Sequence, residues 1–454
     1  MEGFMLIPKV TGPIPVTDIS HPLMASYSLD LASLGYVEEE FFISGKANIY
    51  NWDAFVLFYQ WDANSKLEVI TPDYPYTVRI LVRRPVKASK FSGNIILEGI
   101  HTFFGGIDIV WGKCHEYIMS HGDVWVGISQ PAALSLLKTF DPVRYGPIFG
   151  THDGLIWDII SQVGALLKSK SKANPLYGYK VEYLYGTGYS QTCALLITYI
   201  NAMHELAKLD GNKPIYDGYL PFAAGVRPTT KLNSIKSLNV PVIQVQTQSE
   251  ILSTYVTRKP DSDDPGDRYR RYEIPAATHN YTEPFTYGVL LQDSDRLNVT
   301  RPVNIPPGPF ILNDFPLHYF LNGALANLDL WVRTGTPPPK AERVVVKDGG
   351  TSKAAVIMDD FGNALGGVRT PYVDVPVATY RTGFPDQAAG YKIPFVDALL
   401  KKLYRNHDNY VSRVTQSTEK MVKERWVTDA DAYKIIKEAE SSNVLKDSKK
   451  HRNQ

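Results

Sequence analysis

Short apolar runs that alternate with stretches of helical periodicity constrain the fold of this chain more than any other feature. Asn94–Ile100 and Val124–Ile128 are runs of the kind that form strands buried on both faces. Asp153–Lys168 then has apolar residues at helical spacing, and Val181–Tyr185 is the next predicted strand. Such alternation predicts an α/β architecture, with a mostly parallel central sheet flanked by helices.

Segments of other character lie on both sides of this alternating region. The first 90 residues predict strands at Tyr36–Tyr50 and Tyr76–Val86, with a turn-rich stretch at Ala63–Pro75 between them. Toward the end of the chain, Val344–Tyr380 has β character. The other elements that we expect are helices at Thr192–Leu206, Leu317–Arg333, Phe395–Tyr410 and Thr415–Glu440, and strands at Tyr216–Phe222, Val240–Gln246 and Tyr269–Ile274.

These changes of character divide the chain into three expected parts. Residues 1–90 are predicted to be a β-rich extension packed on the core, residues 91–340 the α/β core, and residues 341–454 a C-terminal β-hairpin with helices. The Pro-rich residues 280–314 are too many for a simple connection and predict a lid-like insertion. The basic tail from about residue 446 is typical of a disordered terminus.

Charge and composition exclude several classes of function. Of 454 residues, 48 are Lys or Arg and 47 are Asp or Glu, so the net charge of +1 gives no reason to expect nucleic acid or an anionic membrane as a partner. Two cysteines cannot form a disulfide framework or a Cys-rich zinc site. No apolar run approaches the roughly 18 residues of a membrane helix, and no targeting segment is visible. We therefore expect a cytoplasmic protein, and nothing in the sequence specifies its oligomeric state.

The segment Val181–Leu196 carries the clearest functional signal. Its predicted strand leads into Gly186-Thr-Gly-Tyr-Ser190, and a helix follows at once. This is the context of a nucleophile elbow, in which a serine on a sharp strand-to-helix turn projects its hydroxyl from the sheet edge. Gly188 is small enough for the tight turn, although Thr192 stands where the usual Gly-x-Ser-x-Gly motif has its last glycine.

Two other interpretations use the same residues. Gly186 and Gly188 could begin a dinucleotide-binding turn, but Gln191 at the third glycine position is too large for close packing of the helix on the strand. No acidic strand end follows at the right distance either. Ser190 could also serve only as a helix cap. The order of strand, serine and helix favours the elbow.

A nucleophilic serine needs a base, and the base needs an orienting acid. With a nucleophile elbow, these residues follow along the chain in the order serine, acid, histidine. Glu250 follows the strand Val240–Gln246, and His279 follows the strand Tyr269–Ile274. Because α/β sheets bind ligands at the carboxyl ends of their strands, Ser190, Glu250 and His279 are predicted to meet there.

Other residues compete for the two supporting roles. The remaining histidines after Ser190 are His204, His318 and His407 in helical patterns and His451 in the tail. The acidic alternatives to Glu250 are Asp261, Asp263, Asp264 and Asp267, in a stretch typical of a solvated loop, and Glu273 inside a strand. We therefore prefer His279 as the base and Glu250 as the acid.

The same chemistry requires N–H donors for the oxygen of a tetrahedral intermediate. One is predicted to be the backbone N–H of Gln191, directly after the nucleophile. The other should come from residues 101–106, where His101 and Thr102 are both candidates. The paired glycines of this loop allow a backbone amide to point inward, and they are also compatible with a plain turn.

Longer strings of the sequence are more specific than the elbow. They include Thr11-Gly-Pro-Ile-Pro, Arg79-Ile-Leu-Val-Arg-Arg-Pro, Gly188-Tyr-Ser-Gln, Trp331-Val-Arg-Thr-Gly-Thr-Pro-Pro-Pro and Gly362-Asn-Ala-Leu-Gly-Gly-Val-Arg-Thr-Pro-Tyr-Val-Asp-Val-Pro. With these strings the chain resembles, over nearly its whole length, the large α/β-hydrolase-domain family of serine esterases found mainly in bacteria. The resemblance implies an α/β-hydrolase fold, with Ser190 as nucleophile, Glu250 as acid and His279 as base.

The chain departs from this family beside the predicted oxyanion hole. Relatives often have Trp-Leu-Asn in place of Gly99-Ile-His101, and Ser-Gly-Gly in place of Thr192-Cys-Ala194. Around the acid, relatives often have Gln-Ser-Glu-Thr-Asp where this chain has Gln246-Thr-Gln-Ser-Glu250. The substrate or the reaction type could therefore differ from the family's. Gly362–Pro376 could contact substrate or form a structural hairpin.

Together these features predict a serine hydrolase that cleaves a carboxylic ester or lactone through an acyl-enzyme intermediate. The substrate is expected to be a small apolar or aromatic molecule, since aromatic residues are frequent in the N-terminal segment and after His279. An acyltransferase with the same triad and a non-catalytic, hydrolase-like binding protein are the alternatives. No cofactor is expected, and no His-Glu-x-x-His motif or paired cysteine indicates a metal site.

Overall fold

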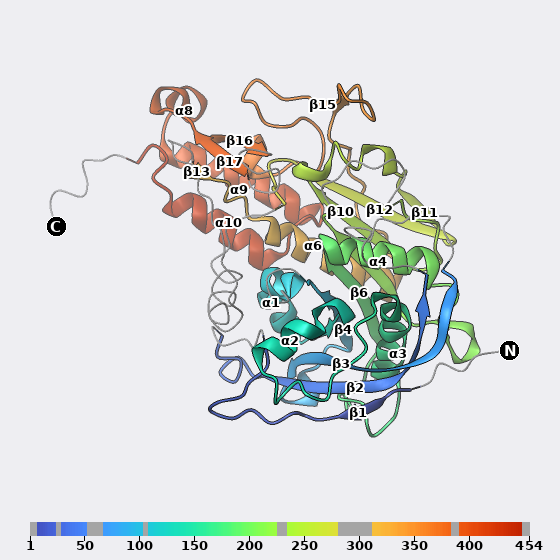
Figure 1. The fold of residues 1–454 in the computed structure, drawn as a ribbon. Helices are drawn as coiled ribbons and strands as arrows, with labels where there is room; N and C mark the ends of the chain where they lie inside the picture. The colour runs from blue at the N-terminus through green and yellow to red at the C-terminus, as the bar shows by residue number, and fades with distance from the viewer. Residues whose placement is uncertain are drawn as a thin grey trace.

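One large sheet forms the centre of the molecule (Figure 1). The computed structural model describes residues 7–23, 29–51, 67–102, 108–224, 234–279, 311–382 and 390–446. Within these residues the sheet has ten strands in the order β1-β2-β3-β5-β4-β6-β9-β10-β12-β11. The strands are β1 (Lys9–Thr11), β2 (Tyr36–Tyr50), β3 (Val69–Pro85), β4 (Asn94–Ile100), β5 (Val124–Ser129), β6 (Tyr183–Tyr189), β9 (Gly218–Phe222), β10 (Val242–Thr247), β11 (Ser262–Asp264) and β12 (Asp267–Ile274).

The middle of the sheet is parallel and its two edges are antiparallel. From β5 through β4, β6, β9 and β10 to β12, each strand pairs in parallel with the next. β3, β2 and β1 continue the sheet antiparallel on one side, and β11 closes the other side. Every residue of β4, β5, β9 and β10 is buried, as the uninterrupted apolar runs predict. The predicted α/β class, with a mostly parallel central sheet flanked by helices, is confirmed by this topology.

Helices cover both faces of the parallel strands and create two hydrophobic cores. Alternate residues of β4 separate between them, with Ile95 and Leu97 in one core and Ile96 in the other. The first core packs against α2 (Leu134–Phe140), α3 (Ile156–Lys168) and α4 (Gln191–Ala202). The second core packs against the helices α1 (Ile109–His121), α6 (Leu317–Thr334), α9 (His407–Lys423) and α10 (Asp429–Ser441).

The N-terminal strands are part of the central sheet. β2 coincides with the predicted strand, whereas β3 begins at Val69 and includes most of a stretch that we expected to be turns. The pairing with β2 explains the difference, because Tyr74 and Thr71 lie opposite Ala47 and Ile49 in an antiparallel ladder. The turn propensity of residues in this stretch is therefore outweighed by the cross-strand hydrogen bonds that they form with β2.

The segment Val344–Tyr380 has less β structure than the sequence predicts. Within Val344–Tyr380 the structure has only the short strands β14 (Val346–Lys347) and β15 (Ala355–Val356), the helical turn α7 (Pro371–Asp374) and the start of β16. Gly362–Pro376 is therefore no hairpin, and its Val368 N–H donates to the Glu273 carbonyl on β12. The remaining short elements are β7 (Lys208–Leu209), β8 (Lys213–Pro214), β13 (Ile311–Leu312), β16 (Ala378–Thr382), β17 (Gly390–Pro394) and α8 (Asp397–Tyr404).

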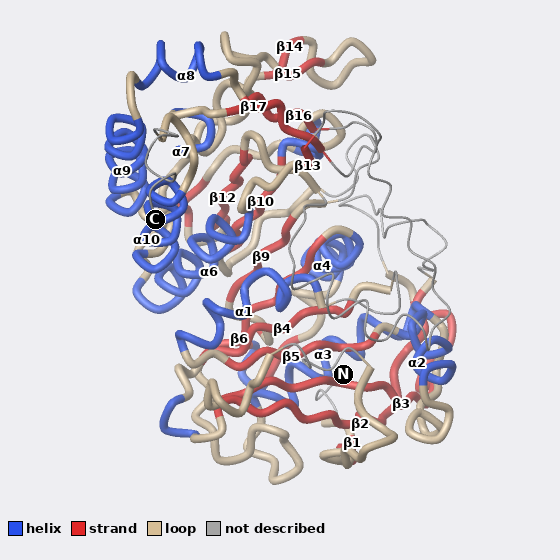
Figure 2. The backbone as a smooth tube through the Cα atoms, turned by 90° about the vertical axis from the view of Figure 1, so that its left-hand side faces the viewer, coloured by secondary structure: helices blue, strands red, loops and turns tan. Residues whose placement is uncertain are grey.

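Two of the predicted C-terminal helices have different boundaries in the structure. The expected helix Phe395–Tyr410 is broken after α8 at Arg405, which has a positive φ of 64°, and Asn406 then caps α9. The expected helix Thr415–Glu440 is broken at Arg425, also at φ 64°, and Thr428 caps α10. In each case a polar cap satisfies the free N–H groups of a new helix start. Figure 2 shows α9 and α10 side by side next to α6.

The division into parts 1–90, 91–340 and 341–454 stays a prediction. The lid-like insertion expected at 280–314 lies outside the described residues except for 311–314, and the tail lies outside them from residue 447.

Candidate functional site

A sharp turn carries Ser190 from the end of β6 into α4. β6 ends at Tyr189 and α4 begins at Gln191, so the strand runs four residues further than the sequence indicated. Ser190 has φ 58° and ψ −117°, a backbone conformation that residues other than glycine rarely adopt. Backbone strain of this kind at a strand-to-helix turn is the geometry of a nucleophile elbow.

Gly188 and Thr192 explain how this turn closes without the last glycine of the usual motif. A Cβ on Gly188 would lie 2.3 Å from the Thr192 carbonyl oxygen, so only glycine fits there. The Thr192 hydroxyl accepts from the Tyr189 N–H at 2.8 Å and donates to the Tyr189 carbonyl at 3.0 Å. The Thr192 side chain therefore closes the turn by hydrogen bonds to both backbone groups of Tyr189. Gly99 lies beside it, and a Cβ added to Gly99 would lie 3.7 Å from the Thr192 methyl carbon.

Glu250 lies just beyond β10, where a 3-10 turn covers Gln248–Glu250. The Thr247 N–H and hydroxyl donate to Glu250 Oε2 at 2.8 and 2.7 Å, which fixes the carboxylate as part of a capping box. Its other oxygen, Oε1, lies 2.7 Å from Nδ1 of His279. The carboxylate is fully buried.

His279 follows β12 and connects Glu250 to Ser190. Its Nε2 lies 2.8 Å from the Ser190 Oγ, and its Nδ1 faces the Glu250 carboxylate. A carboxylate accepts hydrogen bonds only, so Nδ1 carries the proton and Nε2 is left to accept from the serine hydroxyl. The structure thus brings together the three predicted residues in the order hydroxyl, imidazole and carboxylate.

The loop that carries His279 is held by residues that the sequence reasoning did not identify. The Gln248 side chain accepts from the Ala276 N–H at 2.8 Å, and the Ser249 hydroxyl accepts from the His279 N–H at 3.2 Å. The Tyr189 hydroxyl donates to the His279 carbonyl at 2.7 Å. The turn with the acid and the residue before the serine therefore both anchor the histidine loop. Their adjacency to Ser190 and Glu250 was the only signal in the sequence.

The alternative acids are engaged elsewhere. Although burial opposes ionisation, Arg271 and Arg258 hold the pKa of the Glu273 carboxyl below its usual range. The Asp cluster is not a purely solvated loop as we expected, because Ser262–Asp264 pairs with β12 as strand β11. Asp261 accepts from the backbone N–H of Arg271, and Asp263 forms an ion pair with Arg270.

The alternative histidines His204, which lies just after the end of α4, and His407, the first residue of α9, have partners other than Ser190. His204 contacts the Tyr219 hydroxyl at 2.9 Å and Asn239 Oδ1 at 3.1 Å, and burial lowers its pKa. His407 contacts the carbonyls of Val444 and Glu440. These partners occupy both ring nitrogens of each histidine. His451 lies outside the described residues.

The predicted oxyanion donors lie beside the elbow. Gln191 is the first residue of α4, so its backbone N–H has no acceptor within the helix. The Thr102 N–H and hydroxyl both donate to Gln191 Oε1, at 3.0 and 2.9 Å. Burial, and secondarily the nearby His279, lower the pKa of His101 to about 3, so its imidazole is neutral at pH 7. Residues 103–106 of the predicted loop lie outside the described part of the chain.

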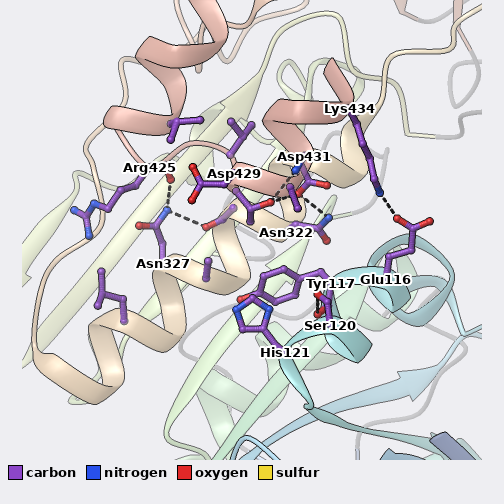
Figure 3. A pocket seen from close by; sticks show the side chains of 17 residues that line it. Glu116, Tyr117, Ser120, His121, Asn322, Asn327, Arg425, Asp429, Asp431 and Lys434 are labelled. Atoms are coloured by element: carbon purple, nitrogen blue, oxygen red, sulfur yellow. Dashed lines mark hydrogen bonds and ion pairs between the residues drawn. The ribbon is translucent and has the colours of Figure 1, made fainter. Parts of the chain in front are cut away.

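A separate cavity of about 580 Å³ lies between α1, α6 and the start of α10 (Figure 3). Its walls include Tyr117, His121, Asn322 and Asp431, and Asn322 Nδ2 donates to Asp431 at 3.0 Å. Ser190, Glu250 and His279 do not line this cavity. Among the described residues, no group of three His, Cys, Asp or Glu side chains is placed to hold a metal ion.

The parallel sheet with an elbow at the end of β6 defines an α/β-hydrolase fold. Residues 10–437 match the family described as Alpha/beta hydrolase domain, and the chain belongs to this family. The predicted family resemblance is thereby confirmed. No curated protein matches the chain.

Two bacterial proteins are among the solved structures to which the chain is similar. One, from Klebsiella pneumoniae subsp. pneumoniae, is assigned as a dienelactone hydrolase. It is 13% identical, with a TM-score of 0.28 over 57% of this chain and 99% of its own. The other, from Xanthomonas campestris, is described as an a/b serine hydrolase without lid. It is 14% identical, with a TM-score of 0.30 over 50% of this chain and 92% of its own. In the part of the chain that the structure describes, no helix has the length and apolar character needed to span a membrane.

Proposed function

We propose that this protein is a serine hydrolase that cleaves a carboxylic ester or lactone of a small molecule. The observation that supports it is the continuous chain of contacts from Ser190 Oγ to His279 Nε2, at 2.8 Å, and from His279 Nδ1 to Glu250 Oε1, at 2.7 Å. A hydroxyl is a weak nucleophile near neutral pH, and an imidazole in hydrogen-bonding reach can remove its proton. Membership of an alpha/beta hydrolase family supports hydrolysis as the reaction class.

In the proposed reaction, Ser190 Oγ forms a bond to the acyl carbon while its proton passes to His279 Nε2. The buried Glu250 carboxylate stabilises the resulting imidazolium and keeps its Nδ1 proton in place. His279 then protonates the leaving alcohol as the ester C–O bond breaks. Water, deprotonated by the same imidazole, releases the acyl group from Ser190.

A fluorophosphonate probe tests the nucleophile. We expect the wild-type protein to be labelled covalently and Ser190→Ala to remain unlabelled. Ser412→Ala is the matched control, because this serine is exposed on α9 and should label like the wild type. An unlabelled wild type, or equal labelling of Ser190→Ala, would overturn the proposal and favour a binding protein.

Hydrolysis of p-nitrophenyl butyrate and of an aromatic lactone such as dihydrocoumarin tests the reaction. Glu250→Gln removes the charge that holds the Nδ1 proton, and turnover should fall by about 10⁴-fold, as for the comparable change in known triads. Binding of the substrate should change little, since the buried Glu250 carboxylate has His279 between it and Ser190. Preferential transfer of the acyl group to an added alcohol rather than to water would instead assign an acyltransferase.

A further inference from the structure

Thr102 directs two hydrogen-bond donors at one oxygen atom. It lies two residues beyond the end of β4. Its N–H and its hydroxyl both donate to Oε1 of Gln191, at 3.0 and 2.9 Å. A backbone N–H can only donate, so the atom that it meets must be the amide oxygen and not the amide nitrogen. The orientation of the Gln191 side chain is therefore determined by its partner.

The acceptor belongs to the residue next to the predicted nucleophile. Gln191 follows Ser190 and begins α4, where its own backbone N–H has no acceptor within the helix. The Gln191 side chain is mostly buried and links the start of α4 to the segment after β4. Two donors that converge on one carbonyl oxygen beside the serine are what a tetrahedral intermediate requires.

We propose that the Thr102 hydroxyl is a catalytic group, a side-chain donor to the oxyanion, and that Gln191 Oε1 occupies the Thr102 donors until substrate replaces it. The inference rests on the proposed serine hydrolase function. As Ser190 Oγ bonds to the acyl carbon, the electron pair of the C=O π bond moves onto the carbonyl oxygen. That oxygen then accepts from the Thr102 hydroxyl, the Thr102 N–H and the Gln191 N–H.

The exchange of acceptors favours the transition state. Without substrate, the amide oxygen satisfies two donors that would otherwise be unpaired beside a buried histidine. A neutral ester carbonyl gains little by displacing a neutral amide oxygen, whereas an oxyanion forms stronger, charge-assisted hydrogen bonds. The contact with Gln191 should therefore raise KM, and the hydroxyl should contribute to kcat.

Thr102→Val tests the hydroxyl, because it keeps the size and the backbone N–H. With p-nitrophenyl butyrate we expect kcat to fall about 10²-fold, the usual loss for one oxyanion donor. The inhibition constant of phenyl trifluoromethyl ketone, which forms a tetrahedral adduct with a serine, should rise by a similar factor. Thr102→Ser keeps a hydroxyl and should restore kcat to within a few-fold of the wild type. Thr418→Val on α9 is the control, since that buried hydroxyl donates to the Val414 carbonyl of its own helix.

Gln191→Met tests whether Gln191 Oε1 occupies the Thr102 donors, because the substitution removes this oxygen and keeps the backbone N–H. We expect KM to fall below the wild-type value. An unchanged KM, or a loss of kcat as large as that of Thr102→Val, would overturn the role of Gln191. A Thr102→Val variant that keeps kcat within twofold, or a Thr102→Ser variant as slow as Thr102→Val, would overturn the role of the hydroxyl. In both cases the wild type is still labelled at Ser190, whereas failure of the proposed function leaves the wild type unlabelled.

Discussion

Gly188 is the residue on which the elbow geometry depends most directly. It precedes the last residue of β6, and the first turn of α4 passes over it. The Thr192 carbonyl carbon would lie 2.6 Å from an added Cβ, and this contact is with backbone that cannot move without opening the turn. The strained conformation of Ser190 therefore requires a neighbour without a side chain.

Gly188→Ala should lower both stability and activity. We expect a loss of several kcal/mol, in the range typical of overpacking combined with backbone strain (about 1–3 kcal/mol or more), and no labelling by fluorophosphonate. Gly99→Ala is the matched control, because its added Cβ would have its nearest contacts at an ordinary 3.7 Å. Urea denaturation and probe labelling of the two variants check this. Equal behaviour of the two would contradict the close contact at Gly188.

At the scale of elements, a buried ion network joins β2 and β3 to the segment after α2. Glu40 on β2 accepts from Arg79 on β3 at 2.7 Å and from Arg144 at 2.6 Å. The Tyr145 hydroxyl also donates to the same carboxylate at 2.7 Å. The side chains of Glu40, Arg79 and Arg144 are at most 2% exposed, so both guanidinium groups form a buried ion pair with the same carboxylate.

Glu40→Gln should destabilise the protein strongly. A neutral amide removes the ion-pair partner of two buried guanidinium groups, and breaking such a pair typically costs about 3–5 kcal/mol. Glu39→Gln, at the adjacent position of β2, removes a pair with Arg84 in which both side chains are about one-fifth exposed, at 21% and 17%. That change should cost less than about 1 kcal/mol. Chemical denaturation of both variants measures the difference, and similar losses would contradict the argument.

At the scale of the whole molecule, buried carboxyls couple global stability to pH. Burial raises the pKa of Asp123 to about 7, against the opposing hydrogen bonds from Ser92 and Asn94. Burial likewise raises the pKa of Glu98 to about 8, although the N–H groups of Val110 and Trp111 at the start of α1 oppose it. Both side chains are almost inaccessible to solvent.

The sign of the pH dependence follows from these shifts. An unfolded carboxyl titrates near pH 4, so between about pH 4 and pH 7 the native state binds a proton at Asp123 that the unfolded state has released. Stability from this group is complete below pH 4 and is lost as the pH rises to about 7, by at most about 1.4 kcal/mol per pH unit. Asp123→Asn should flatten the slope of the unfolding free energy between pH 5 and pH 7. An unchanged slope, measured by urea denaturation, would show that Asp123 is ionised in the native state.

Much of the local structure of this protein could be predicted from residues close in sequence, without the tertiary structure. The apolar runs predicted β4 and β5 nearly to the residue, and the Gly188–Ser190 turn predicted an elbow, because a strand, a turn and a helix start are set by neighbouring residues. The order of serine, acid and histidine also limited the candidates for the site to a few side chains at strand ends.

The tertiary structure decided what depends on residues far apart in the chain. His279 meets a serine 89 residues earlier, and only the pairing of β12 with β10 shows that Glu250 rather than Glu273 faces its imidazole. The placement of Gln191 Oε1 on the two Thr102 donors likewise could not be read from the sequence. The physical reason is that a hydrogen bond acts over about 3 Å, and the distances between these segments are set by the packing of the whole sheet.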